Sequence, residues 1–499
     1  MDHKRFALRV LIVLFGVALF GFVAEAAWEF LHAVDPVTGL PLKLTQLQVS
    51  PMMVRAVTSP FARAYNNILA LLLTFISLAI PLTANLYTPK LIEIFIRDRI
   101  NVLVLGCCAL LAAHSILATM LSYDNWTPQL PFYISGLGAL LGWLLLLPYY
   151  FYVLSFIDPL TIIKRVHLSL MEELQDAVVG KHPVKQAQAR VHQRIINLGS
   201  LLQRSMDRAD RDVVFDAIRA HTMDLARVRQ LKPDLPPAFF EVTSELLIGM
   251  SSDATGLLSR ERTWVEYRIA SQLALAFKIA LAKMPDGVSA LVHAIKNAAF
   301  EEAHLRNDAV YVVLVRLFNT FMREAIKKKE NAPVYYVVYN YKTLIRRLLV
   351  ERPELVPELV RYLRYYAEFA RTQGLAFIYE LISYELAEVT ELAYERGAET
   401  AMVLLDAVLE FEGADHSPGL VKSRAILAGF FRERGLSDEL ASVLSTLREV
   451  PRPTLEAARV GILTTTEPVF WEMTDRGTNI DYVPDARRDQ VEKVFNSLM

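Results

Sequence analysis

Cysteine is almost absent from this chain of 499 residues. The only two, Cys107 and Cys108, are adjacent and lie within an apolar run. Neighbouring cysteines on a helix point in different directions, so this pair does not staple distant segments together. The long cysteine-free remainder fits a reducing compartment and excludes a cysteine-based metal site there.

Short motifs that carry familiar chemistry are also missing. The sequence has no glycine-rich phosphate loop ending in Gly-Lys-Ser/Thr, no dinucleotide fingerprint, no His-Glu-x-x-His and no nucleophile elbow. Glu-x-x-His pairs occur at Glu29 and His32 and at Glu301 and His304. The topology derived below places them on opposite sides of a membrane, so they cannot build one di-iron site. We therefore expect no catalytic, cofactor-binding or metal-binding residues, and we expect that the chain is not an enzyme.

Neither sign of charge dominates the chain. Its net charge is −1, so no basic field predicts a nucleic-acid partner. The apolar content of 53% and the mean hydropathy of +0.29 exceed what a soluble domain needs, yet 21% of residues are charged. The charges gather after residue 160. This division predicts a membrane part followed by a large soluble part.

Four apolar runs account for the membrane part, at 6–24, 66–86, 100–121 and 131–157. Each is near or above the ~20 residues that a helix needs to cross a bilayer. The first run also has the basic head and small residues of a signal peptide, and its cleavage would leave three spans.

The charge of the connectors orients these spans. Lys and Arg occur in the head, in the 89–99 connector and just after the fourth run, whereas the 122–130 connector has neither. Positive residues stay on the cytoplasmic side, so both termini and the 89–99 connector are expected inside. The 25–65 and 122–130 connectors are then expected outside.

The soluble part reads as helix after helix. Apolar positions recur at spacings of three and four, and alternating strand patterns are almost absent. No repeat of fixed period is found. We expect an all-α protein whose large cytoplasmic helical domain is an α-solenoid or an irregular helical bundle. A proline-rich break near residue 233 suggests a four-span domain at 1–158, a juxtamembrane helical stalk at 159–232 and the main helical domain at 233–499.

The connector between the second and third runs carries the turn Tyr87-Thr88-Pro89-Lys90-Leu91, the step Phe95-Ile96-Arg97-Asp98-Arg99 and the pair Leu105-Gly106. It resembles the signature of an uncharacterised family of predicted bacterial membrane proteins, domain of unknown function twenty-two fifty-four. That family has a Tyr-Ser-Pro-Arg-Leu turn, a Phe-x-Arg-Asp-Arg step and a Leu-Gly pair at the same place. The resemblance covers about residues 66–122 and implies a multi-pass protein of the bacterial inner (plasma) membrane. The family has no established activity to carry over.

The same connector is the first candidate site. Pro89 ends the span because it lacks an N–H and disfavours helix at the residue before it. The cations then lie at the lipid headgroups, where each gains about 1 kcal/mol near anionic lipid. Alternatively, the Arg-Asp-Arg step docks the soluble domain or a partner. The candidate residues are Tyr87, Pro89, Lys90, Arg97, Asp98 and Arg99.

His114 is the second candidate, because it is the exceptional ionisable residue within the spans. A proton or ion pathway would use such a group. A neutral histidine also serves simply to hydrogen-bond a neighbouring helix.

Tyrosines with neighbouring arginines form the third candidate. Tyr is enriched where proteins meet partners because it offers apolar area with a polar tip. The alternative is an amphipathic rim of a helical core. The candidate partner surface comprises Tyr335, Tyr336, Tyr339, Arg346, Arg347, Tyr362, Arg364 and Tyr365.

These observations favour a non-catalytic, membrane-anchored scaffold or accessory subunit of an inner-membrane complex. Its expected partners are membrane lipids and either another protein or further copies of itself. The alternative is a channel or transporter subunit with a cytoplasmic regulatory domain, which with four spans requires a homo-oligomeric pore.

Overall fold

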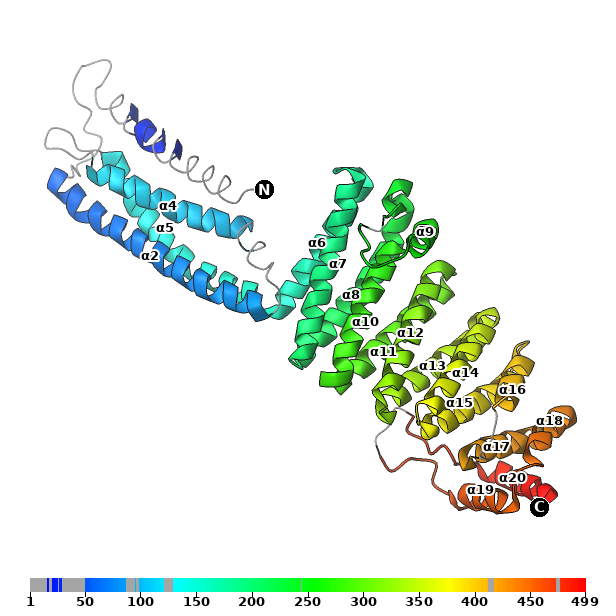
Figure 1. Ribbon diagram of the computed structural model, residues 1–499. Coiled ribbons are helices and arrows are strands. Elements are labelled where there is room, and N and C mark those ends of the chain that lie inside the picture. The colour runs from blue at the N-terminus through cyan, green and yellow to red at the C-terminus, as the bar shows by residue number, and fades with distance from the viewer. Residues whose placement is uncertain are drawn as a thin grey trace. The chain divides into compact units, whose positions relative to one another are not determined.

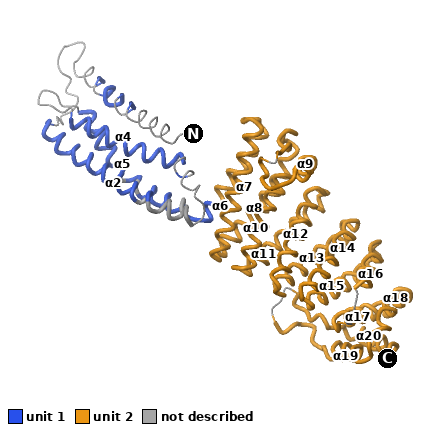
Figure 2. The backbone as a smooth tube through the Cα atoms, viewed as in Figure 1, with its two compact units in different colours: residues 1–162 blue, residues 163–499 orange. Residues whose placement is uncertain are grey.

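The structure is a computed structural model that forms two compact units, residues 1–162 and 163–499 (Figures 1 and 2). It describes residues 16, 17, 20–25, 27, 28, 50–86, 95, 98–120, 129–243, 245–411, 417–472 and 476–499. All regular structure in these residues is helical, apart from one isolated β-bridge between Val469 and Thr478. The all-α fold expected from the sequence is therefore confirmed.

Three long helices make up most of the described part of the first unit: α2 (Pro51–Leu86), α4 (Arg99–Met120) and α5 (Gln129–Ile157). Each packs against the other two. Glycines permit the contact, since a Cβ at Gly142 would lie 2.9 Å from the Tyr65 ring and one at Gly138 would clash with Leu111. The small residues of α5 thus bring the backbones close, as in membrane helix packing.

These helices follow the expected apolar runs. The run 66–86 lies within α2, the third run coincides with α4, and the fourth lies within α5. Within the described residues, α4 is long and apolar enough to cross a membrane. The segments Gln129–Gly142 and Leu147–Ser155, bent by 43°, would together make a second such span. Most of the run 6–24 lies outside the described residues.

The second unit is a succession of helices joined mostly by short turns (Figure 1). Helix α6 carries the chain across the division between the units. The helices are α6 (Pro159–Val179), α7 (Val184–Asp207), α8 (Arg211–Leu231), α9 (Ser252–Arg260), α10 (Trp264–Lys283), α11 (Pro285–His304), α12 (Asp308–Lys328), α13 (Asn331–Glu351), α14 (Val356–Thr372), α15 (Ala376–Glu395), α16 (Ala401–Leu409), α17 (Pro418–Arg434), α18 (Ser437–Leu447), α19 (Arg452–Thr464) and α20 (Asp485–Leu498).

These helices stack in two layers. In layer A, α8, α11, α13, α15 and α17 pack one on the next, and in layer B α7, α10, α12, α14 and α16 do the same. Of the residues 159–232 expected as a stalk, 163–232 lie in the same compact unit as the residues that follow, with α7 packed on α10 and α8 on α11. Each amphipathic helix thereby buries its apolar stripe between neighbours.

Aromatic side chains join neighbouring helices both within a layer and between the layers. The Phe277 and Phe321 rings stack with centroids 4.1 Å apart, joining α10 to α12. The Phe318 ring meets the edge of Tyr341, which joins α12 to α13. Gly435 ends α17 in the left-handed region at φ 71°, where a residue with a Cβ would be strained. The sharp reversal lets the following helix pack back on the stack.

Candidate docking site on the helical unit

A pocket of about 440 Å³ opens between α13, α15 and the segment 465–484 that joins α19 to α20, whose described residues, 465–472 and 476–484, are not helical. Four aromatic residues dominate its walls, and polar groups interrupt them. The lining residues are Asn331, Ala332, Tyr335, Tyr336, Phe377, Leu381, Phe470, Glu472, Arg476, Thr478 and Ile480. Concave, mostly apolar sites with a few polar groups are the usual form of a binding site.

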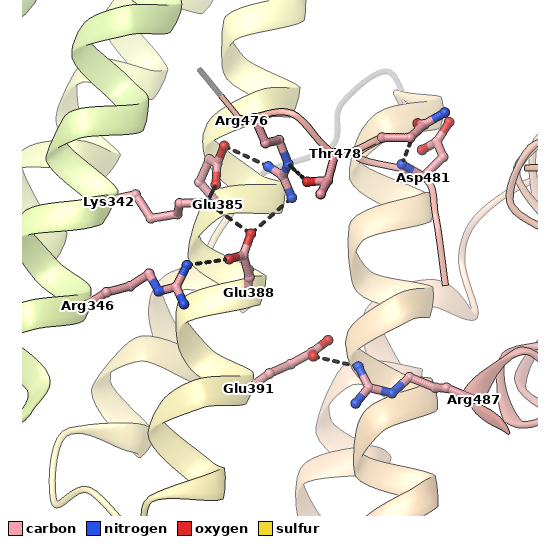
Figure 3. A network of polar contacts seen from close by, with 10 residues as sticks. Lys342, Arg346, Glu385, Glu388, Glu391, Arg476, Thr478, Asp481 and Arg487 are labelled. Carbon is pink, nitrogen blue, oxygen red and sulfur yellow. Dashed lines mark hydrogen bonds and ion pairs between the residues drawn. The ribbon is translucent and has the colours of Figure 1, made fainter. Parts of the chain in front are cut away.

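Arg476 fixes the segment 465–484 to α15 (Figure 3). Its guanidinium donates from Nη1 to Glu385 Oε1 at 2.7 Å and from Nη2 to Glu388 Oε2 at 3.0 Å. From α13, Lys342 lies 2.6 Å from Glu385 Oε2, and Arg346 lies 3.2 Å from Glu388. The Lys342 and Glu385 side chains are 3% and 0% exposed, so their part of the network is buried, whereas Glu388 and Arg346 are partly exposed.

The network has three cations for two carboxylates. Burial opposes ionisation of Glu388, yet Lys342 and Arg476 outweigh it and hold the pKa of Glu388 below its usual value. Without Arg476, two cations and two carboxylates would remain on α13 and α15. The helix surface is therefore electrically balanced on its own, and Arg476 adds one charge when the segment 465–484 is in place.

Further contacts hold the same end of the chain. Asp481 accepts a hydrogen bond from Tyr384 Oη at 2.5 Å and pairs with Lys422 at 2.6 Å. Arg487 of α20 reaches Glu391 of α15 at 2.6 Å, and burial raises the pKa of Glu391 to about 7 although Arg487 opposes it. These contacts hold the segment 465–484, which forms one wall of the pocket, close to α15 although the two are far apart in the sequence.

The tip of the segment 465–484 is apolar. The Phe470 and Trp471 rings lie 4.2 Å apart, and the Trp471 side chain is 80% exposed while Phe470 lines the pocket. An exposed Trp beside an aromatic pocket is the composition of a protein-binding hot spot. The described residues contain no group of three or more side chains suited to a metal ion.

The structure divides the candidate partner surface between two helices. Tyr335, Tyr336, Tyr339, Arg346 and Arg347 lie on α13, in layer A. Of these, Tyr335 and Tyr336 line the pocket and Arg346 belongs to the ion network.

The other members lie on α14, in layer B. Arg364 pairs with Glu410, Tyr362 donates to Glu358 at 2.6 Å, and Tyr365 is exposed. Only the α13 group therefore contributes to the pocket. The sequence placed these tyrosines in one surface because it gives no register between successive helices.

The connector candidates are described only in part. Tyr87, Pro89, Lys90 and Arg97 lie outside the described residues. Asp98 accepts from the backbone N–H of Ile100 at 3.1 Å at the start of α4, next to Arg99.

A hydrogen bond to Asp98 also links two helices of the first unit. Tyr152 Oη of α5 donates to Asp98 at 2.7 Å. Asp98 thus caps α4 and ties it to α5, a structural role that the sequence did not suggest.

His114 joins three segments of the first unit. Its Nδ1 lies 3.0 Å from Ser135 Oγ of α5, and its Nε2 lies 2.8 Å from Glu25 Oε2. The Phe22 ring meets the imidazole edge to face. The sequence pointed to His114 but gave no reason to pair it with Glu25, which stands at the end of the first apolar run.

Sequence reasoning also missed the residues that complete the pocket. Phe377, Phe470 and Arg476 carry no motif, and the ion pair between Arg476 and Glu385 spans 91 positions. The available signal was the interruption of helical periodicity between α19 and α20, which marked a non-helical segment but not its docking place.

Comparison with known proteins bears on the N-terminal part of the chain. No curated protein and no solved structure matches the chain. The resemblance drawn from residues 66–122 is confirmed and extended by a match to a family model. Residues 3–210 of this chain match the family described as "Predicted membrane protein (DUF2254)".

Proposed function

We propose that this chain is a non-catalytic scaffold or accessory subunit of an inner-membrane complex, held in the membrane by four spans. Its helical unit, residues 163–499, is then cytoplasmic, stacked like a solenoid and available to a partner. The observation that carries the proposal is the aromatic pocket beside the exposed Trp471. When a partner covers such an apolar surface, the burial lowers the free energy of the complex.

The construction of the pocket supports binding rather than chemistry. Of its two charged lining residues, Glu472 and Arg476, the arginine is held in place by the carboxylates of Glu385 and Glu388. Its aromatic walls are supplied by α13, α15 and the segment 465–484. Rigid aromatic side chains bind with little loss of conformational freedom.

Purification in mild detergent from native membranes tests this function. We expect a stoichiometric partner or a homo-oligomer to co-purify with the full chain. Phe377→Glu places a charge in the pocket wall at a partly exposed position, so it is expected to release the partner while leaving the fold intact. Tyr365→Glu, at an exposed position on α14 in layer B, is the matched control and is expected to retain it.

Two results would contradict the proposal. A strictly monomeric wild-type particle without any co-purifying protein would remove the scaffold function. Retention of the partner by Phe377→Glu together with its loss from Tyr365→Glu would move the binding surface to α14 and away from the pocket.

His114 favours a second candidate function, a channel or transporter subunit. A histidine that contacts a carboxylate and a hydroxyl from two other segments is the kind of group that ion pathways use. Flux into liposomes containing the purified oligomer tests this candidate. No conductance, and no effect of His114→Ala on any flux, would eliminate it.

A further inference from the structure

Four aromatic side chains from three parts of the chain surround the aromatic pocket. Tyr335 and Tyr336 come from α13, Phe377 comes from α15, and Phe470 comes from the segment 465–484. An aromatic face carries negative charge density, so rings gathered around one space attract a cation as well as apolar groups. This set of walls therefore fits a cationic group on an apolar stem.

Glu472 adds a full negative charge to the lining of the same pocket. The residue is exposed, and it has no ion pair with any lysine or arginine of the described residues. Its carboxylate is therefore available to a cation that enters between the rings.

The other charged lining residue, Arg476, does not cancel the charge of Glu472. Its guanidinium is bonded to Glu385 and Glu388, as Figure 3 shows. Lys342 pairs with the same two carboxylates at 2.6 and 3.0 Å. These two cations and two carboxylates balance one another, so Glu472 sets the sign of the charge at the pocket.

Two further positive charges are too weak to reverse this sign. Arg346 lies ten positions along α13 from Tyr336, which is about 15 Å at 1.5 Å per residue. This distance exceeds the Debye length of about 8 Å at physiological ionic strength, and the Arg346 side chain is 48% exposed, so solvent screens its charge. The N-terminus of α13, at Asn331, contributes only about half of an elementary charge. A net negative charge remains.

We propose that the aromatic pocket receives an arginine side chain of the protein partner. The guanidinium stacks on the rings and donates hydrogen bonds to the carboxylate of Glu472. Arginine fits better than lysine, because its planar and weakly hydrated guanidinium stacks on aromatic faces and pairs with a carboxylate through two parallel hydrogen bonds. This inference rests on the proposed function, since it states what the partner of the scaffold presents to the pocket.

Saturation-transfer NMR on the full chain in detergent tests the pocket without the partner. The probe is a blocked tripeptide with arginine at its centre, and it is compared with the same peptide carrying glutamine or glutamate. We expect the arginine peptide to bind at least fivefold more tightly than the glutamine peptide, because only the first gains the cation–π and ion-pair contacts. The glutamate peptide should bind most weakly, because Glu472 repels it.

Three variants separate the contributions of charge and ring. Glu472→Gln should weaken the arginine peptide about two- to fivefold and remove most of the salt dependence of its binding. Phe470→Ala should weaken it by a similar factor, because one ring is lost. Glu467→Gln makes the same charge change in the same segment, at an exposed position outside the pocket lining, and should bind like the wild type. The charge is not tested at Phe377, because Phe377→Glu removes a ring and adds a carboxylate at once.

Three results would overturn the proposal. Equal binding of the three peptides to the wild type would show that the pocket does not select a cation. Tighter binding of the arginine peptide by Glu472→Gln would give the pocket the opposite preference. Unchanged binding in both Glu472→Gln and Phe470→Ala would place the arginine elsewhere.

The complex purified from native membranes separates this proposal from the scaffold function. Excess arginine peptide should release the partner from the wild-type chain, whereas the glutamate peptide should not. A partner that co-purifies and stays bound in excess arginine peptide would refute the arginine and leave the scaffold function standing. A monomeric chain that still binds the arginine peptide would refute the scaffold function while supporting the preference of the pocket for a cation.

Discussion

Replacing Arg476 by Gln should loosen the segment 465–484 without unfolding the helical stack. The substitution removes two charge-assisted hydrogen bonds, at 2.7 Å to Glu385 and 3.0 Å to Glu388. Bonds to charged groups contribute about 1.5 to 3 kcal/mol each, and orphaning a buried charge costs about 3 to 5 kcal/mol. Here neither carboxylate is orphaned, because Lys342 remains beside both. We therefore expect a loss of roughly 2 to 3 kcal/mol, below the cost of an orphaned charge.

Removing the Glu385 carboxylate instead of the arginine should destabilise the protein more. Glu385→Gln leaves Lys342, Arg346 and Arg476 around a single remaining carboxylate, that of Glu388. Lys342 is nearly fully buried, so the excess charge is poorly hydrated. We expect Glu385→Gln to destabilise the protein by about 4 kcal/mol. The sharper prediction is that it destabilises the protein more than Arg476→Gln does.

Hydrogen exchange provides the assay, because it reports local opening. The amides of Phe470 and Asn479 donate to Gly477 O and Pro468 O within the segment. Arg476→Gln should speed their exchange about 30- to 150-fold, which corresponds to 2 to 3 kcal/mol at 1.36 kcal/mol per factor of ten. Core amides of α12 should be unaffected, and Arg432→Met, an exposed arginine of α17, is the control. Unchanged exchange at Phe470 and Asn479, or a uniform rise throughout the stack, would refute the reasoning.

Three further outcomes are expected. Burial lowers the pKa of His221 to about 3 in the folded chain, while a histidine in the unfolded chain titrates near pH 6.5. The contribution of His221 to the free energy of unfolding is therefore fully present above pH 6.5 and is lost as the pH falls toward 3. His221→Phe should therefore flatten the acid side of the stability profile by up to about 5 kcal/mol in thermal melts, and an unchanged profile would count against it. In a variant lacking both native cysteines, a membrane-impermeant thiol reagent should label Met52→Cys and Asn125→Cys in intact cells but not Ser252→Cys, and labelling at Ser252 would overturn the topology. Gly142→Ala should destabilise the packing of α2 on α5 by about 1 to 3 kcal/mol because its Cβ meets a tyrosine ring, which denaturation in mild detergent would measure.

The sequence predicted what depends on local pattern. Apolar runs located α4 and α5, and spacings of three and four located the helices of the second unit, because both signals are contained within one element.

The contacts between distant elements could not be predicted in this way. Glu25 meets His114 across 89 positions, and Arg476 meets Glu385 across 91. A single charged residue in a non-helical segment has many oppositely charged candidates, and periodicity does not select among them. The aromatic pocket follows from such a contact, so the sequence pointed to only two of its eleven lining residues, Tyr335 and Tyr336.

The ion pairs of Arg476 with α15 also have a consequence for synthesis of the chain. The Glu385 carboxylate is translated 91 residues before its arginine, which is about 5 to 18 seconds at 5 to 20 residues per second. During that interval the nascent α13–α15 surface has only its own lysine and arginine as counter-ions. The surface reaches its final charge and shape when almost the whole chain has been made. A truncated product ending before Arg476 would therefore lack one wall of the pocket, and a partner that requires this wall would bind only finished chains.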